Sequence, residues 1–276
     1  MKIKHTKWHS FILLILIACS TGINLYSDRD EVKLGIQFDD QIKNDPEGYP
    51  IYTGDPSVKE YIDKNIFHEI LTSPEVKKAA VYQYQMEIIQ NDSVLNAFAV
   101  PGGYVYIYTG ILKYLDSEAA LAGVLGHEIA HVERRHATQR ITAAYGLQFI
   151  LSIALGNNPS KTAELAANMF GGLALLANSR SDEAESDEYS IKYLMSTRFY
   201  PGSVKFFFEK LRDDGKVSKG GQSIATFLST HPDPINRIDK TEKTLASLGI
   251  EIKHYTDSGE GIFKDSYMKN VANKLK

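Results

Sequence analysis

Residues 117–135 read SEAALAGVLGHEIAHVERR, a run of small and apolar residues that ends in charged ones. Ser117 is a typical N-cap residue, so the sequence predicts one long helix from about 117 to 135. His127 and His131 are four positions apart, which places both imidazoles on one face of this helix. Because so apolar a helix is expected to be buried, its two histidines need polar partners or a metal ion.

The two histidines and Glu128 form the pattern HExxH. In this pattern two ring nitrogens can reach one zinc ion at about 2.0–2.1 Å, and the glutamate can take a proton from a water molecule at the metal. The alternative is a helix that carries two structural histidines by chance. The apolar, helical context favours the zinc interpretation, so we expect one Zn²⁺ per chain with Glu128 as the general base.

A catalytic zinc site usually has three protein ligands and keeps one position for water. His136 is the nearest further candidate, but on a continuous helix it would point about 180° away from His127. It also does not match the spacing of the longer HExxHxxGxxH motif. We therefore expect His136 to be a solvated residue at the end of the helix and not a ligand.

An acidic segment, residues 182–188, offers a better third ligand. Glu183 and Asp187 are four positions apart and share one face of a predicted helix. One of them could bind zinc while the other accepts the outer N–H of a ligand histidine. The alternative is a solvated, acidic first turn of a helix that is capped by Ser179 or Ser181.

Four segments resemble a known family in their order and spacing. They are NAFAVPGG at 96–103, the HExxH helix, SRSDEAESD at 179–187 and Thr230-His231-Pro232. The chain resembles the HtpX and BepA type of zinc metallopeptidase, metallopeptidase family forty-eight, which also includes the Oma-type proteases. The resemblance spans residues 55 to 245. It implies that Glu183 is the third zinc ligand and that Asp187 supports a ligand histidine, although Ser186 stands where the family usually has alanine.

The resemblance also gives a role to His231, which lies in a turn-rich stretch before a proline. Residues alone would suggest a solvated loop histidine. The family pattern instead implies that His231 lies near the active site. There it would either occupy the open metal position in a latent state or stabilise the oxyanion, so we count it with Glu128 among the catalytic residues.

The segments on either side of Pro101-Gly102-Gly103 predict a β-hairpin, because 96–100 is apolar and 104–108 alternates with period two. The resemblance implies that one edge strand pairs with an extended substrate. A further strand is predicted at 82–89, and helices at 57–71, 141–155, 163–177, 183–197, 202–212 and 234–247. The predicted fold class is α+β: a mostly helical, gluzincin-like zincin domain with a small antiparallel sheet beside the HExxH helix.

The first residues predict export. Lys2, Lys4 and Lys7 precede an apolar run at 11–19 that is too short to span a bilayer as a mature anchor. LIAC at 16–19 resembles a bacterial lipobox, and Cys19 is the only cysteine. We expect Cys19 to be lipidated and to hold the protein at a membrane surface. The alternative is a plain secretory signal with an incidental cysteine.

These signals predict four parts: a lipoprotein signal peptide at 1–18, a lipid-anchored tether at 19–54, the zinc metallopeptidase domain at 55–250 and a C-terminal tail at 251–276. The expected location is the bacterial cell envelope, facing the periplasm, and Ser20 after the cysteine resembles residues that permit sorting to the outer membrane.

The composition agrees with one sizeable folded domain, since 43% of the 276 residues are hydrophobic. A formal net charge of −3 argues against nucleic acid as a partner. The function that the sequence predicts is a zinc-dependent endopeptidase that degrades misfolded or unassembled envelope polypeptides. The alternatives are a non-proteolytic zinc-binding lipoprotein that acts as a chaperone or assembly factor, and a cell-wall amidase.

Overall fold

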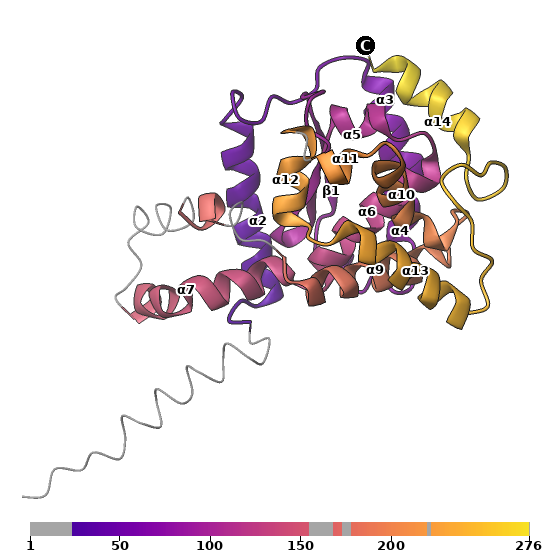
Figure 1. Cartoon of the computed structure of the whole chain (residues 1–276). Helices are drawn as coiled ribbons and strands as arrows, with labels where there is room; N and C mark the ends of the chain where they lie inside the picture. The colour runs from indigo at the N-terminus through magenta and orange to yellow at the C-terminus, as the bar shows by residue number, and fades with distance from the viewer. Residues whose placement is uncertain (1–23, 155–167, 173–177, 220–221, 276) are drawn as a thin grey trace, which may run out of the picture.

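The computed structural model describes residues 24–154, 168–172, 178–219 and 222–275 (Figure 1). Cys19 and the predicted signal peptide lie outside the described residues, as does most of the helix predicted at 163–177. Within the described ranges no helix combines the length and the apolar character needed to cross a bilayer.

The chain is mostly helical, as the sequence predicts. The α-helices are α2 (Asp28–Lys43), α3 (Pro56–Ile62), α4 (His68–Leu71), α5 (Thr109–Tyr114), α6 (Glu118–Glu133), α7 (His136–Ala154), α9 (Arg180–Leu194), α10 (Val204–Asp213), α11 (Lys216–Lys219), α12 (Gln222–Thr230), α13 (Pro234–Ser247) and α14 (Lys264–Asn270). A π-helical turn, η1 (Asp63–Phe67), joins α3 to α4, and η2 (Pro101–Gly103), η3 (Pro201–Ser203) and η4 (Ala272–Lys274) are short 3₁₀ turns.

The sheet has three strands, β1 (Gln85–Ile89), β2 (Ala97–Val100) and β3 (Tyr104–Tyr108), in the order β1-β3-β2. The predicted hairpin is confirmed, because β2 pairs antiparallel with β3. The expectation of a purely antiparallel sheet is wrong, because β1 pairs parallel with β3. Two successive connections each reverse the chain, so the first and third strands run in the same direction. Since β3 occupies the centre, the sheet is mixed.

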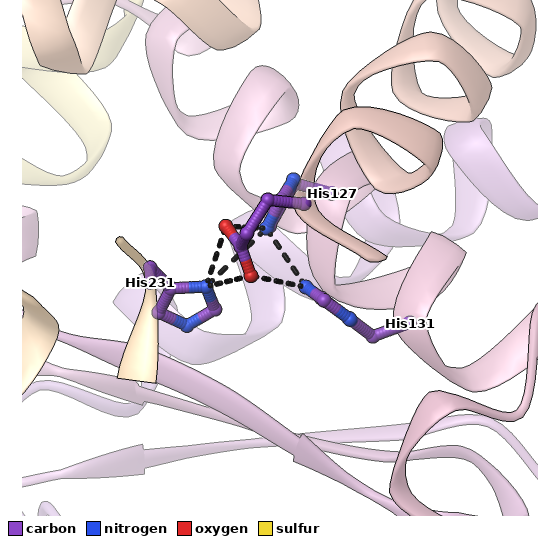
Figure 2. Close-up of side chains that lie close together, drawn as sticks. His127, His131 and His231 are labelled. Atoms are coloured by element: carbon purple, nitrogen blue, oxygen red, sulfur yellow. Dashed lines mark hydrogen bonds and ion pairs between the residues drawn. The ribbon is translucent and has the colours of Figure 1, made fainter. Parts of the chain in front are cut away.

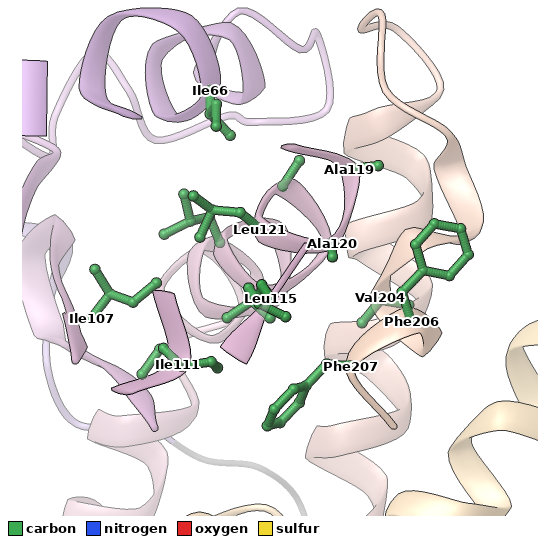
Figure 3. Packing of buried hydrophobic residues seen from close by; sticks show 14 of the residues in the cluster. Ile66, Ile107, Ile111, Leu115, Ala119, Ala120, Leu121, Val204, Phe206 and Phe207 are labelled. Atoms are coloured by element: carbon green, nitrogen blue, oxygen red, sulfur yellow. The ribbon is translucent and has the colours of Figure 1, made fainter. Parts of the chain in front are cut away.

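The two faces of the sheet support two separate cores, because alternate side chains of a strand point in opposite directions. Val105 and Ile107 of β3 face the main core, where Leu121 of α6 and Phe207 of α10 also pack (Figure 3). Tyr104 and the other two tyrosines of β3 face a second apolar cluster that is shared with α2. The sheet is therefore covered by α6 and its neighbours on one side and by α2 on the other.

Helix α6 is the buried centre of the main core, and all of its residues are buried. Ser117 caps it as predicted, and its side chain accepts a hydrogen bond from the backbone of Ala120. Gly123 lets the backbone of η3 come close, since a Cβ there would lie 2.5 Å from the carbonyl carbon of Ser203. This close packing fixes the position of the helix that carries the HExxH pattern.

Residues 24–54 do not form the polar tether that the sequence predicts. Helix α2 begins with a capping box between Ser27 and Asp30, and its Phe38 and Ile42 are fully buried against the sheet. The prolines and glycines that indicate a tether lie only at 46–54, after the end of α2 at Lys43, so they do not describe the residues before them. This segment is part of the folded unit.

The sequence predicts a tail at 251–276, but several apolar side chains in the second half of this segment pack into the main core. Ile262, Tyr267 and Val271 are fully buried there. The carbonyl of Ile262 also accepts a hydrogen bond from the backbone of Ala119, in the first turn of α6. The segment therefore contributes to the support of the HExxH helix.

Candidate metal centre

Four side chains from three parts of the chain meet in one buried group. His127 and His131 come from α6, Glu183 from the first turn of α9, and His231 from the residue after α12. One ligand atom of each lies within 4.8 Å of the others. Figure 2 shows the three labelled histidines turned toward one carboxylate. The structure thus brings together every residue that the sequence proposed as a ligand, together with His231.

The spacing of these atoms suits a tetrahedral metal ion. The Nε2 atoms of His127 and His131 are 3.0 Å apart, and Glu183 oxygens lie 3.5 and 3.3 Å from them. The Nδ1 atom of His231 is 3.4 Å from Nε2 of His127 and 3.1 Å from Glu183. Ligands at zinc distances of about 2.0–2.1 Å would be roughly 3.3–3.4 Å apart in a tetrahedron. The group therefore fits zinc in size and in donor chemistry.

The proton positions also favour a cation at the centre of the group. Nδ1 of His127 lies 2.9 Å from Asp187, so it carries the proton and leaves Nε2 as a lone pair. Nδ1 of His131 lies 2.9 Å from Nδ1 of His136, and the other ring nitrogen of His136 bonds to Glu185. His131 therefore carries its proton on Nδ1 and also leaves Nε2 as a lone pair. Two lone pairs and a carboxylate then face one another, and this arrangement is repulsive unless a metal cation or a proton lies between them.

Helix α9 brings its two carboxylates to α6 in the predicted way. Ser179 forms a capping box with Asp182, which starts the helix, and Glu183 and Asp187 then lie one turn apart on the buried face. Glu183 reaches the ligand nitrogens, whereas Asp187 reaches only the outer nitrogen of His127. The resemblance implies that Glu183 is the ligand and Asp187 its support; the structure places both side chains beside His127, and their roles stay a prediction.

Arg237 of α13 balances the negative charge, and no motif in the sequence points to it. Its guanidinium makes two hydrogen bonds to Asp187, of 2.7 and 2.6 Å, and a third to Glu183. Burial opposes ionisation of both carboxyls, but Arg237 and the neighbouring histidines hold their pKa values below the usual range. An arginine on an amphipathic helix is normally read as exposed. The available signal was charge balance, since several buried carboxylates need a cation.

The surroundings of His127 and His131 shift the pKa values of the two rings in opposite directions. Burial and Arg237 disfavour protonated His127, but hydrogen bonds to Asp187 and Glu183 outweigh them and raise its pKa to about 9. Surroundings that favour a proton on this ring also favour a metal cation at the same position. Burial holds the pKa of His131 well below its ordinary value, which keeps that ring neutral, as metal binding requires.

His136 is not the solvated residue that the sequence predicts. Only 1% of it is exposed, and it links Nδ1 of His131 to the carboxylate of Glu185. The prediction failed because α6 ends at Glu133 and Arg135 takes a positive φ of 64°. That turn redirects the chain, so the geometry of one continuous helix does not apply.

Glu128 and His231 open onto a cavity of about 140 Å³. Glu128 is 3% exposed, burial raises its pKa, and its carboxylate lies 3.7 Å from Nε2 of His231. Phe98, Ala99 and Val100 line the same cavity. They belong to β2, which is an edge strand of the sheet. Glu128, members of the candidate metal group and a strand edge that no other described strand pairs with therefore border one space.

Comparison with known proteins agrees with this geometry. Residues 57–245, which include all four members of the metal group, match the model of peptidase family M48. The chain is 29% identical over 194 residues to the beta-barrel assembly-enhancing protease of Escherichia coli, which covers 67% of this chain and 38% of that protein. It is 31% identical over 169 residues to the mitochondrial metalloendopeptidase OMA1 of Schizosaccharomyces pombe, which covers 61% of this chain and 49% of that protein. The matches thus span less than half of either relative. The chain belongs to peptidase family M48.

Proposed function

We propose that this chain is a zinc-dependent endopeptidase. The observation that carries the proposal is the convergence of His127, His131 and Glu183 in one buried group, with His131 lining the same cavity as Glu128. Zinc held by these three ligands would polarise a peptide carbonyl and make water more acidic. Family membership and the names of the relatives support the same activity.

The residues around the ligands have distinct tasks in this proposal. Glu128 accepts the proton of the attacking water and passes it to the leaving amine, which its burial and raised pKa favour. Asp187 fixes the tautomer of His127, and His136 does the same for His131. Arg237 keeps Glu183 and Asp187 ionised, and its positive charge offsets part of their negative charge.

The substrate we propose is an extended polypeptide. β2 has an unpaired side, because β3 is its only neighbour in the sheet among the described residues. A substrate strand could add to that side and place its scissile bond next to Glu128. Main-chain pairing tolerates many sequences, which suits misfolded or unassembled proteins as substrates.

His231 supports a latent resting state. Its Nδ1 atom occupies the fourth corner of the group, where a catalytic site keeps water. The ring stacks on Phe227, with 4.8 Å between ring centroids, which helps to hold it there. We propose that His231 must move away before peptide can be cleaved. His231→Ala should change the rate of proteolysis without loss of zinc, and an unchanged rate would remove this role.

The proposed setting is quality control of proteins in the bacterial envelope. It rests on the relative named for beta-barrel assembly and on the lipobox-like sequence at Cys19. Mass spectrometry of the mature N-terminus tests the anchor, because a free, unacylated Cys19 contradicts it. Proteins that accumulate in cells with a Glu128→Gln variant under envelope stress would identify the natural substrates.

A non-proteolytic zinc-binding chaperone is the second candidate, because four protein ligands are typical of structural zinc sites. Glu128 distinguishes the two, since a structural site needs no base. With zinc bound, Glu128→Gln should abolish cleavage of an unfolded substrate while the metal content stays at one ion per chain. Equal cleavage by the variant and the parent would contradict the peptidase proposal, whereas Glu183→Ala should lose the metal itself.

A further inference from the structure

Asn178 lies at the edge of the metal group, and none of the roles above includes it. It precedes α9, is 6% exposed and lines the cavity that Glu128 and His231 also line. Its Nδ2 atom is 3.3 Å from Nε2 of His131 and 3.4 Å from Nδ1 of His231. Its backbone N–H donates to the carbonyl of Thr230, 3.1 Å away, which holds it beside His231.

Arg140 decides which way the amide of Asn178 points. A guanidinium only donates hydrogen bonds, and Nη1 of Arg140 donates to Oδ1 of Asn178. The NH₂ group must therefore face the ligand nitrogens. The reversed amide would set donor against donor at Arg140. The side chain of Asn178 thus points its NH₂ group toward the metal group, as a hydrogen-bond donor and not as an oxygen ligand.

This donor would need a new acceptor in a working site. When the lone pair of His131 is used by a metal and His231 has moved away, the two nitrogens that now face Nδ2 no longer accept hydrogen bonds. The amide then faces the cavity beside Glu128, where a substrate carbonyl would lie. An amide side chain fixed in this way is pre-organised, so it need not reorient when charge develops on the substrate.

We propose that Asn178 donates a hydrogen bond to the carbonyl oxygen of the scissile peptide as that oxygen becomes an oxyanion. Arg140 is then the positioning residue that keeps the amide in the donating orientation. The inference rests on the proposed peptidase function. It adds an oxyanion donor to the base Glu128, and it places that donor just before α9, away from the helix α6 that carries Glu128.

The step balances as follows. The water oxygen bonds to the carbonyl carbon, Glu128 takes one water proton, and the π electrons of the carbonyl move to its oxygen, where Asn178 donates. On collapse the carbonyl re-forms, the carbon–nitrogen bond breaks, and the amine leaves with the proton held by Glu128. Asn178 loses no proton at any stage, so its effect is purely electrostatic.

The test compares Asn178→Ala with the parent and with a matched control, Gln139→Ala. Gln139 is a neighbouring amide on α7 whose Nε2 atom bonds only to the carbonyl of Arg134 among the described residues. For each zinc-loaded protein we would measure kcat, KM and zinc content with an unfolded peptide substrate. We would also measure the affinity for a phosphonamidate analogue of that peptide, which imitates the tetrahedral oxyanion.

Asn178→Ala should lower kcat by about 10²–10³-fold, the usual effect of losing one oxyanion donor. KM and zinc content should stay at the parent values, and phosphonamidate affinity should weaken along with kcat/KM. Arg140→Met should reduce both in the same direction, and Arg140→Lys should recover part of the loss because lysine still donates to Oδ1. Gln139→Ala should match the parent.

Two results would overturn the inference. One is an Asn178→Ala protein that keeps the parent kcat and phosphonamidate affinity, and the other is a loss of zinc, which would make Asn178 a support of the ligands. If neither the parent nor the unblocked His231→Ala variant cleaves the peptide, the proposed function fails. The phosphonamidate affinities of parent and variant then still decide whether Asn178 contacts the oxyanion, because this measurement needs no turnover.

Discussion

Replacing Arg237 with methionine should strongly destabilise the chain, because it removes the cation between two buried carboxylates. Arg237 is 3% exposed, and three of its hydrogen bonds go to Asp187 and Glu183, which are also buried. Methionine keeps much of the apolar volume over Phe208, on which the guanidinium stacks at 4.2 Å. The loss therefore reports charge pairing more than packing.

The expected loss is about 3–5 kcal/mol in the free energy of unfolding, the usual effect of removing one partner from a buried ion pair. For a domain of this size that lowers the melting temperature by roughly 6–20 °C. Zinc should recover part of the loss, because it gives Glu183 another cation. Asp187 gains less, since it bonds only to the outer nitrogen of His127.

Urea unfolding of the chelator-treated protein, with and without added zinc, measures these quantities. Arg212→Met is the control, because Arg212 is 47% exposed and its partner Asp213 is 42% exposed, so its loss should be below about 1 kcal/mol. Adding Asp187→Asn to Arg237→Met should cost less than the sum of the single changes. If Arg237→Met loses no more than the Arg212 control, charge pairing by Arg237 does not stabilise this site.

Three further predictions follow from other parts of the structure. Phe38→Ala should cost about 3–5 kcal/mol, because Phe38 is fully buried under the sheet, whereas Ile36→Ala on the exposed face of α2 should change stability by less than about 0.5 kcal/mol; equal effects in urea unfolding would mean that α2 is not part of the core. Gly123→Ala should destabilise the chain by about 1–3 kcal/mol or more, because the added Cβ would meet backbone at the start of α10. Gly126→Ala should be milder, because the Cβ there comes closest to the hydroxyl of a serine side chain, which can move. The reverse order of melting temperatures would refute the packing argument. His136→Phe should weaken zinc binding by about 10–100-fold in a chelator competition, because His131 loses its partner, and an unchanged affinity would show that the contact is incidental.

The fold could be predicted where one local pattern decides the structure. The apolar run before His127 predicted α6 to within two residues of its observed end, and the glycine turn at 101–103 predicted the β2–β3 hairpin. The parallel pairing of β1 could not be predicted, because local alternation does not say which strand takes the centre of a sheet. The burial of residues in 251–276 could not be predicted for a similar reason, because it depends on contacts with α6, which lies far away in the sequence.

The members of the metal group could be predicted from two kinds of evidence, the spacing within one helix and the resemblance to a family. HExxH spacing suffices for His127 and His131, because one helix holds both. Glu183 and His231 lie far along the chain. The acidic segment made Glu183 and Asp187 candidates for the third ligand, and the resemblance to a family chose Glu183 and connected His231 to the pair. Asn178 and Arg237 belong to no sequence motif. Their places beside the metal group can be recognised only once α6, α9 and α13 are packed together. The ligand roles themselves, like the lipidation of Cys19, remain predictions.

The segment at 259–275 has a consequence for the order in which the protein matures. Its backbone meets the first turn of α6, and Ile262 and Tyr267 complete the core on which that helix rests. Synthesis proceeds from the N-terminus, so α6 is made well before this support exists. We expect the metal group to reach its final geometry only after residues 259–275 have emerged. If the proposed peptidase function holds, the nascent chain would then be unable to cut neighbouring chains during its own synthesis.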